Sequence, residues 1–320
     1  MLDAIAEESL VLADGRTLCY TTFADPSSSP TPVQSGTEGQ SRQRTVFYFH
    51  GYPGTYHEGL PFHEAASKKG IRVVAVTRPG FGGSTHQPNR TLLSFAIDVL
   101  AVADHLRIDR FAIIGMSGGC PYALACLHTL PRERLLGVVV VSGLYPISLG
   151  IDGMMLLNRV IFTFAPWVPS PILSLIFDSV MGRPARNAKN PEKLVQDLAA
   201  SLESRTAEDA AAIRLDSGKF LKGLAASTRD AFRHGAEGSA WEAKLFSGPW
   251  GFDLKDLKAE KGKLVMWHGS KDVNCPVQMA EKAARLIPNA DLRVEKEEAH
   301  ISLIIKKLDE FVDALLGMFE

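Results

Sequence analysis

Five short apolar runs recur along the chain, and helical patterns separate most of them. The runs are "TVFYF", "IRVVAV", "FAII", "LLGVVVV" and "KLVMW", and a more polar run, "DLRVEK", follows them. Strands that are apolar at nearly every position are buried on both faces, which is typical of a parallel sheet covered by helices. The alternation of strands and helices indicates the same arrangement. The sequence therefore predicts an α/β fold with a mostly parallel central sheet flanked by helices.

The pattern changes near the N-terminus and in the middle of the chain. Residues 9–24 predict a β-hairpin around the Asp14-Gly15 turn, and residues 26–44, rich in Ser, Pro, Gly, Thr and Gln, predict a flexible surface loop. Residues 146–249 lack the strand pattern and are helical in character. The segment is too long for a loop and returns to the same sheet. We therefore predict one core, residues 1–145 and 250–320, interrupted by a helical insertion.

Helical apolar spacing allows individual helices to be predicted. In the core we expect them at 91–106, 121–130, 277–286 and 302–319. In the insertion we expect them at 154–164, 173–180 and 191–232. The second half of the insertion is charged, so it is expected to face mostly water.

Composition excludes several classes of protein. The chain has 320 residues, with 35 Lys and Arg against 36 Asp and Glu, and this near-zero net charge argues against a nucleic-acid binder. No membrane span is expected, because the longest uncharged run, 160–177, contains three prolines. The acidic N-terminus does not resemble a signal peptide, and the four cysteines form no CxxC pair, so a cytoplasmic location is expected. The histidines show no metal-ligand spacing, so neither a metal nor a cofactor is expected.

A glycine-rich pentapeptide carries the clearest chemical signal. Gly115-Met116-Ser117-Gly118-Gly119 stands between a predicted strand and a predicted helix, which is the G-x-S-x-G pattern in its required context. Glycines flank such a serine because the turn is tight and side chains would clash with the strand or the helix. The alternative interpretation is a glycine-rich turn with an incidental serine. We favour Ser117 as a nucleophile.

Two downstream residues can activate this serine. Asp272 follows the run "KLVMWHG" and His300 follows "DLRVEK", so both stand where parallel strands end. The order Ser, Asp, His matches one arrangement of the catalytic triad. Taken singly, His300 could be a surface histidine and Asp272 a helix cap. Asp253 and Asp256 are competing acids, but they precede a strand.

With these motifs the chain resembles the α/β-hydrolase family. The resemblance also rests on the segments "HGYPG" at 50–54, "RPGFGGS" at 78–84, "HGSKDVNCP" at 268–276 and "EEAHIS" at 297–302. It implies an α/β-hydrolase fold with an inserted helical lid. It also implies an oxyanion hole formed by the backbone N–H groups of Tyr52 and Gly118. A serine at the elbow disfavours the members that open epoxides or displace halides, which carry an aspartate there.

These features predict a cofactor-independent serine hydrolase that forms an acyl-enzyme. The expected substrate is a small, hydrophobic molecule, because the first half of the insertion is strongly apolar. The bond cleaved is expected to be an ester, a lactone or a C–C bond next to a ketone. Met116, Phe164 and Trp167 are the candidate pocket residues. The alternatives are a small-molecule receptor, a lyase or cyclase on the same fold, and a proline-releasing aminopeptidase that would hold an amine with Glu203 and Glu237. A homodimer is a possible assembly.

Overall fold

Eight strands form one sheet in the computed structural model, which describes residues 6–23, 43–215 and 218–320. The strands are β1 (Glu8–Val11), β2 (Thr17–Phe23), β3 (Arg44–Phe49), β4 (Ile71–Val76), β5 (Phe111–Met116), β6 (Leu135–Val141), β7 (Leu264–Gly269) and β8 (Asp291–Glu295). Their order is β1-β2-β4-β3-β5-β6-β7-β8; the β1–β2 and β2–β4 pairings are antiparallel and the other five are parallel. The predicted mostly parallel α/β sheet is confirmed. The loop expected at 26–44 falls almost wholly outside the described residues.

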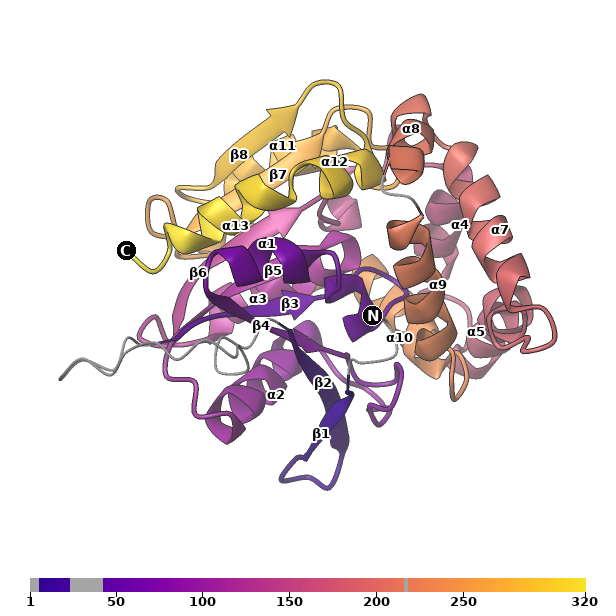
Figure 1. Ribbon diagram of the computed structural model, residues 1–320, viewed down its shortest axis with the longest axis horizontal. Coiled ribbons are helices and arrows are strands. Elements are labelled where there is room, and N and C mark those ends of the chain that lie inside the picture. Colours follow the sequence, from indigo (N-terminus) through magenta and orange to yellow (C-terminus); the bar gives the residue numbers. More distant parts are fainter. Residues whose placement is uncertain (1–5, 24–42, 216–217) are drawn as a thin grey trace.

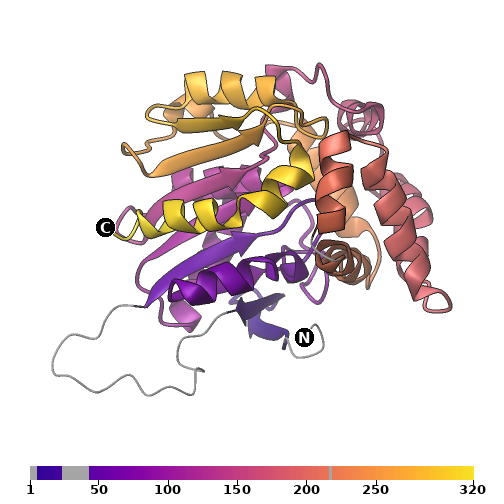
Figure 2. The ribbon, with the colours of Figure 1, turned by 45° about the horizontal axis from the view of Figure 1, so that its top comes forward.

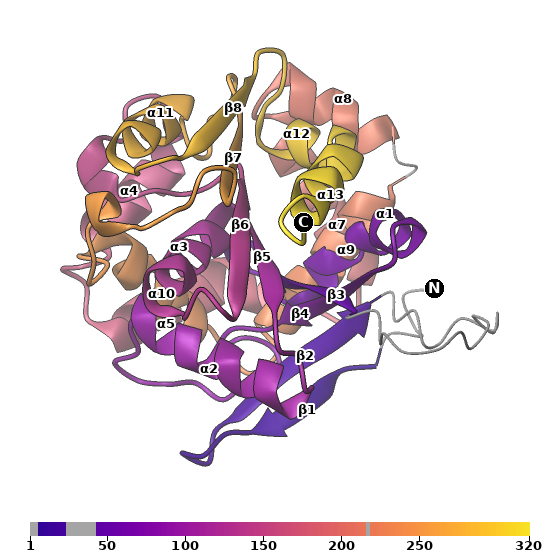
Figure 3. The ribbon, with the colours of Figure 1, turned by 90° about the vertical axis from the view of Figure 1, so that its left-hand side faces the viewer.

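Helices cover both faces of this sheet (Figures 1 and 3). On one face, α2 (Leu92–His105), α3 (Cys120–Thr129) and α11 (Val277–Leu286) pack their apolar sides against the strands. On the other face lie α1 (Phe62–Lys68) and α13 (Leu308–Leu316). Both faces of the apolar strands are therefore covered by helices and kept from water, as their sequence requires.

In the described residues between β6 and β7 there are seven α-helices. They are α4 (Leu156–Phe164), α5 (Ser170–Phe177), α6 (Arg183–Ala185), α7 (Pro191–Glu203), α8 (Ala207–Leu215), α9 (Lys219–Ala231) and α10 (Glu237–Ser247). We call residues 146–249 the inserted segment. Figures 1 and 2 show its helices gathered at the end of the sheet where the parallel strands finish. This end of the sheet is where the predicted site residues lie.

Two predicted helices are wrong in extent. Residues 302–319 form α12 (His300–Lys306) and α13, because the backbone leaves the helical region at Lys307. The two halves pack on different partners: α12 lies against α8, whereas α13 lies against α1 and β6. Residues 191–232 form α7, α8 and α9, with breaks around Arg205 and at Gly218, which adopts a left-handed conformation. The described residues contain no helix that is both long and apolar enough to cross a membrane.

Candidate active site

Ser117 occupies a sharp turn between β5 and α3. Its φ is +49°, in the left-handed region that side chains other than glycine rarely adopt. The flanking glycines are needed for steric reasons, since a Cβ on Gly115 would lie 2.9 Å from Ala123 and a Cβ on Gly119 would overlap the carbonyl oxygen of Phe49. The turn thus lifts the serine hydroxyl out of the sheet and holds it above the start of α3.

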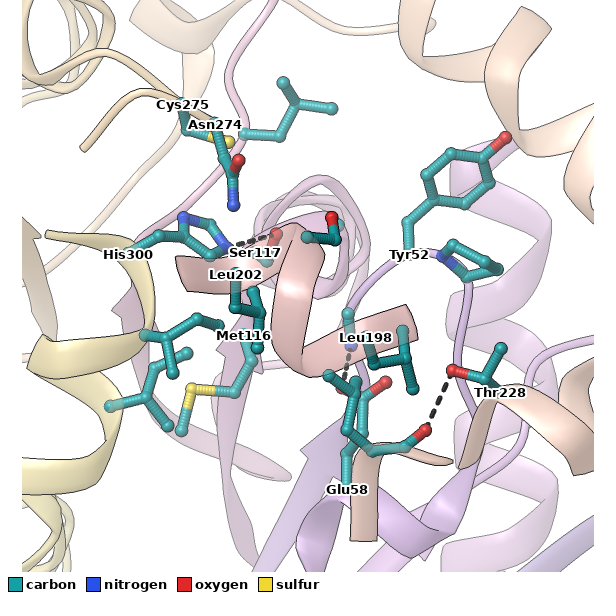
Figure 4. A pocket seen from close by; sticks show the side chains of 18 of the residues that line it. Tyr52, Glu58, Met116, Ser117, Leu198, Leu202, Thr228, Asn274, Cys275 and His300 are labelled. Atoms are coloured by element: carbon teal, nitrogen blue, oxygen red, sulfur yellow. Dashed lines mark hydrogen bonds between the residues drawn. The ribbon is translucent and has the colours of Figure 1, made fainter. Parts of the chain in front are cut away.

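The structure brings Ser117, His300 and Asp272 together from the ends of β5, β8 and β7. His300 Nε2 lies 3.0 Å from Ser117 Oγ, and His300 Nδ1 lies 2.7 Å from Asp272 Oδ2 (Figure 4). Both contacts are within hydrogen-bonding distance. In this row of contacts the imidazole can take the proton of the serine hydroxyl, and the carboxylate can hold the ring in one tautomer.

Asp272 is fully buried and well supplied with hydrogen-bond donors. Its Oδ1 accepts backbone N–H groups from Asn274, at 2.8 Å, and Cys275, at 2.9 Å. Burial alone would raise the pKa of Asp272, but His300, the neighbouring His268 and these backbone donors hold it below its ordinary value. The carboxylate is therefore ionised at neutral pH and can stabilise an imidazolium on His300.

His300 itself is fixed by the inserted segment. It opens α12, whose next two backbone N–H groups, those of Ile301 and Ser302, donate to Asp209 Oδ1 at 2.8 and 2.9 Å. Asp209 comes from α8 and is fully buried. The expectation that the second half of the insertion faces water is wrong at this residue, because the helix N-terminus that it caps favours a nearby negative charge.

Tyr52 and Gly118 lie side by side next to the serine. A Cβ on Gly118 would be 3.2 Å from the backbone nitrogen of Tyr52 and 2.6 Å from its Cβ. Only a glycine permits this approach. Within the described part of the chain, the Tyr52 N–H makes no hydrogen bond to another protein group, so it is free to donate to a ligand.

A cavity of about 290 Å³ opens above Ser117 and continues under the inserted segment. Met116, Ser117, Gly118, Tyr52 and His300 line it, as Figure 4 shows for four of them. The inserted segment adds mainly apolar side chains, among them Met155, Ile161, Phe162, Leu198, Leu202 and Leu224.

Phe164 and Trp167 do not reach this cavity, and their prediction as pocket residues is wrong. Their exposed fractions are 57% and 83%. Ile161 and Phe162 of α4 line the cavity, and the 3.6-residue period of the helix turns Phe164 away from it. Trp167 lies beyond the end of α4. Glu203 and Glu237 also lie outside the cavity, at exposed positions. The competing acid Asp253 is exposed as well, and Asp256 belongs to a short 3-10 turn at Leu254–Asp256.

Sequence reasoning missed two charged residues of the cavity wall. Glu58 lies in the 3-10 turn Tyr56–Gly59, and burial raises the pKa of its carboxyl to about 6 against the lowering effect of the Gly51 N–H. Arg205 follows α7 and donates to the Asn274 side chain at 3.1 Å. Nothing in the local sequence distinguishes them from solvated charges, although Glu58 follows closely on the "HGYPG" segment.

Among the described residues there is no group of three or more His, Cys, Asp or Glu placed to hold a metal ion. The four cysteines are free and buried.

The strand order, the strained serine turn and the three converging strand ends define an α/β hydrolase. A model of the α/β-hydrolase fold matches residues 44–307, and the chain belongs to that family.

Solved structures share the fold along almost the whole chain. An esterase from Exiguobacterium antarcticum is 15% identical, with a TM-score of 0.61, over 98% of this chain and 100% of that one. An enol-lactonase from Burkholderia xenovorans LB400 is 18% identical, with a TM-score of 0.61, over 98% and 99%. Est816, an N-acyl homoserine lactone degrading enzyme, is 19% identical, with a TM-score of 0.62, over 97% and 99%. At these identities the likeness establishes the fold alone.

Proposed function

We propose that this α/β hydrolase is a serine hydrolase with Ser117 as nucleophile, His300 as general base and acid, and Asp272 as the residue that orients His300. The observation that carries the proposal is the chain of contacts from Ser117 Oγ through His300 to Asp272, at 3.0 and 2.7 Å, on the floor of a cavity. A serine on a strained turn, with an imidazole at its hydroxyl and a buried carboxylate behind the ring, is the arrangement that nucleophilic catalysis by serine requires.

The reaction proceeds in two halves. Ser117 Oγ attacks the substrate carbonyl carbon while His300 Nε2 takes its proton, and a tetrahedral oxyanion forms between the N–H groups of Tyr52 and Gly118. Collapse of this intermediate expels the leaving group, which receives the proton from His300, and leaves an acyl-enzyme on Ser117. A water molecule, activated by His300, then releases the acid and restores the serine.

The substrate is a small, uncharged and largely apolar ester or lactone. The cavity volume of about 290 Å³ is at the low end for ligand sites, and its wall is mainly aliphatic and aromatic. The esterase and the two lactonases with the same fold are consistent with this class. Cleavage of a C–C bond next to a ketone forms the same kind of oxyanion, so this reaction remains within the proposal. The inserted segment serves as a lid over residues 1–145 and 250–320, and the cytoplasmic location and homodimer stay predictions.

The three alternatives have distinct signatures. A receptor would keep the triad but turn over its ligand slowly or only once. A lyase or cyclase would form no acyl-enzyme. An aminopeptidase of the proline-releasing kind is disfavoured because Glu203 and Glu237, the acids proposed to hold an amine, lie outside the cavity.

The test is labelling with a fluorophosphonate, followed by peptide mapping and burst kinetics with a chromogenic ester. We expect labelling at Ser117, a stoichiometric burst, and loss of both in Ser117→Ala. The control is Ser201→Ala, because Ser201 also lines the cavity but is not bonded to His300. Labelling of a different serine, or turnover by Ser117→Ala, would overturn the assignment.

A further inference from the structure

The peptide unit that joins Gly51 to Tyr52 is held by several buried polar groups. Its carbonyl belongs to Gly51 and its N–H to Tyr52, and the two point in opposite directions because the unit is planar and trans. Fixing the carbonyl therefore fixes the N–H that we propose as an oxyanion donor. The Gly51 carbonyl oxygen accepts a hydrogen bond from Arg78 Nη2 at 2.8 Å and another from His50 Nδ1 at 2.9 Å.

His50 is locked in the one tautomer that suits this role. Its Nε2 accepts the backbone N–H of Arg78 at 3.1 Å, so its ring proton is on Nδ1 and points at the Gly51 carbonyl. Burial and the Arg78 charge lower the pKa of His50 well below its ordinary value, which keeps the ring neutral. A second side chain, Glu58, accepts the N–H of Gly51 through Oε2 at 2.6 Å, a contact drawn as a dashed line in Figure 4. Gly51 is thus restrained at both its N–H and its carbonyl.

Arg78 is fully buried, and its counter-charge comes from the inserted segment. Glu242 on α10 accepts Arg78 Nε at 2.6 Å and Nη2 at 2.9 Å, a bidentate pair with neither side chain exposed. Glu242 also accepts Arg90 Nη2 at 2.9 Å and the Tyr122 hydroxyl at 2.8 Å. Burial would raise the pKa of Glu242, but the two arginines hold it below its ordinary value, so the carboxylate is ionised. Without it, two like charges would remain buried together.

We propose that Arg78 and Glu242 are positioning residues for the oxyanion hole, an inference that rests on the proposed function. Arg78 holds the Gly51 carbonyl so that the Tyr52 N–H faces the position beside Ser117. Its charge also polarises that carbonyl, which strengthens the N–H of the same peptide as a donor when the oxyanion forms. Glu242 holds the guanidinium in place and keeps it charged without repulsion from Arg90.

This role makes α10 part of the catalytic apparatus as well as part of a cover. Two further contacts join the inserted segment to the same loop: the Tyr52 hydroxyl donates to the Ser239 carbonyl at 2.7 Å, and the Thr55 N–H donates to Ser227 Oγ at 2.9 Å. The competing explanation is that the buried pair merely joins the inserted segment to the core. That explanation predicts lower stability without a specific loss of transition-state binding.

The experiment compares Glu242→Gln and Arg78→Lys with Asp98→Asn. Asp98 is a matched control because it makes a bidentate, largely buried pair with Arg16, at 2.7 and 3.0 Å, that joins the residue before β2 to α2 away from the cavity. For each variant we measure the folded fraction by circular dichroism, kcat and KM for an activated ester, and the affinity for a trifluoromethyl ketone, which forms a tetrahedral adduct with the serine.

We expect Glu242→Gln and Arg78→Lys to lose about 10- to 100-fold in kcat, less than the 10²- to 10³-fold cost of removing an oxyanion donor. KM should change by less than about threefold, and trifluoromethyl ketone affinity should fall in parallel with kcat. Asp98→Asn should lose stability but keep kcat. Should Glu242→Gln not fold, Arg78→Lys, which keeps the positive charge, provides the same comparison.

Folded Glu242→Gln or Arg78→Lys protein with normal kcat would overturn the inference, as would equal losses in Asp98→Asn. These failures differ from failure of the proposed function, in which the unmodified enzyme itself would show no fluorophosphonate labelling at Ser117.

Discussion

Replacing Asp272 by Asn tests the proposed triad most directly, because the two oxygens of this carboxylate have different partners. Oδ1 accepts two backbone N–H groups and Oδ2 faces His300 Nδ1. In the variant, the amide oxygen must occupy the Oδ1 position, since an NH₂ group there would face two donors. The NH₂ group then points at His300 Nδ1 and requires that nitrogen to be unprotonated.

The ring proton of His300 is thereby moved to Nε2, which faces Ser117 Oγ and can no longer take its proton. The matching substitution in the serine-protease triad lowers kcat by about 10⁴, and we expect a loss of the same order here. Folding should be nearly unaffected, because the amide keeps the volume and the backbone contacts of the carboxylate.

The assay is kcat for an activated ester, with circular dichroism on each variant. Asp253→Asn and Asp256→Asn are the controls, since the Asp253 side chain is 69% exposed and neither residue belongs to the cavity wall. Both should keep normal kcat. A folded Asp272→Asn enzyme within about tenfold of normal, or an inactive Asp253→Asn, would refute the assigned acid.

Three other outcomes follow from the same geometry. Gly118→Ala should fold but lose kcat, as measured with the activated ester, because its Cβ would lie 2.6 Å from the Tyr52 Cβ. Trp167→Ala should leave kcat/KM for a hydrophobic ester unchanged, whereas Phe162→Ala should lower it, since only Phe162 lines the cavity. The pKa of Glu58 is raised to about 6, so its protonation stabilises the folded state at low pH, and this contribution is lost as pH rises through about 6. The unfolding free energy of Glu58→Gln in urea should accordingly depend less on pH between about 4.5 and 7 than that of the unmodified protein.

Local patterns were sufficient to predict the sheet and to nominate Ser117, Asp272 and His300. Strands buried on both faces must be apolar throughout, and a serine on a tight turn needs glycines beside it, so both features are visible in short stretches of sequence. Helix α11 lies at the predicted residues 277–286, and its amphipathic period places an apolar side against β7 and β8.

Long-range packing decided what those patterns could not. The charges of Asp209 and Glu242 look like solvated helix positions, yet both are fully buried because their partners, the N-terminus of α12 and Arg78, come from distant parts of the chain. Conversely, Trp167 is apolar in sequence but faces outward. Residue type and spacing determine which faces of an element can be buried, but only the tertiary structure determines which partner each face meets, and the positions of the site's supporting charges depend on those partners.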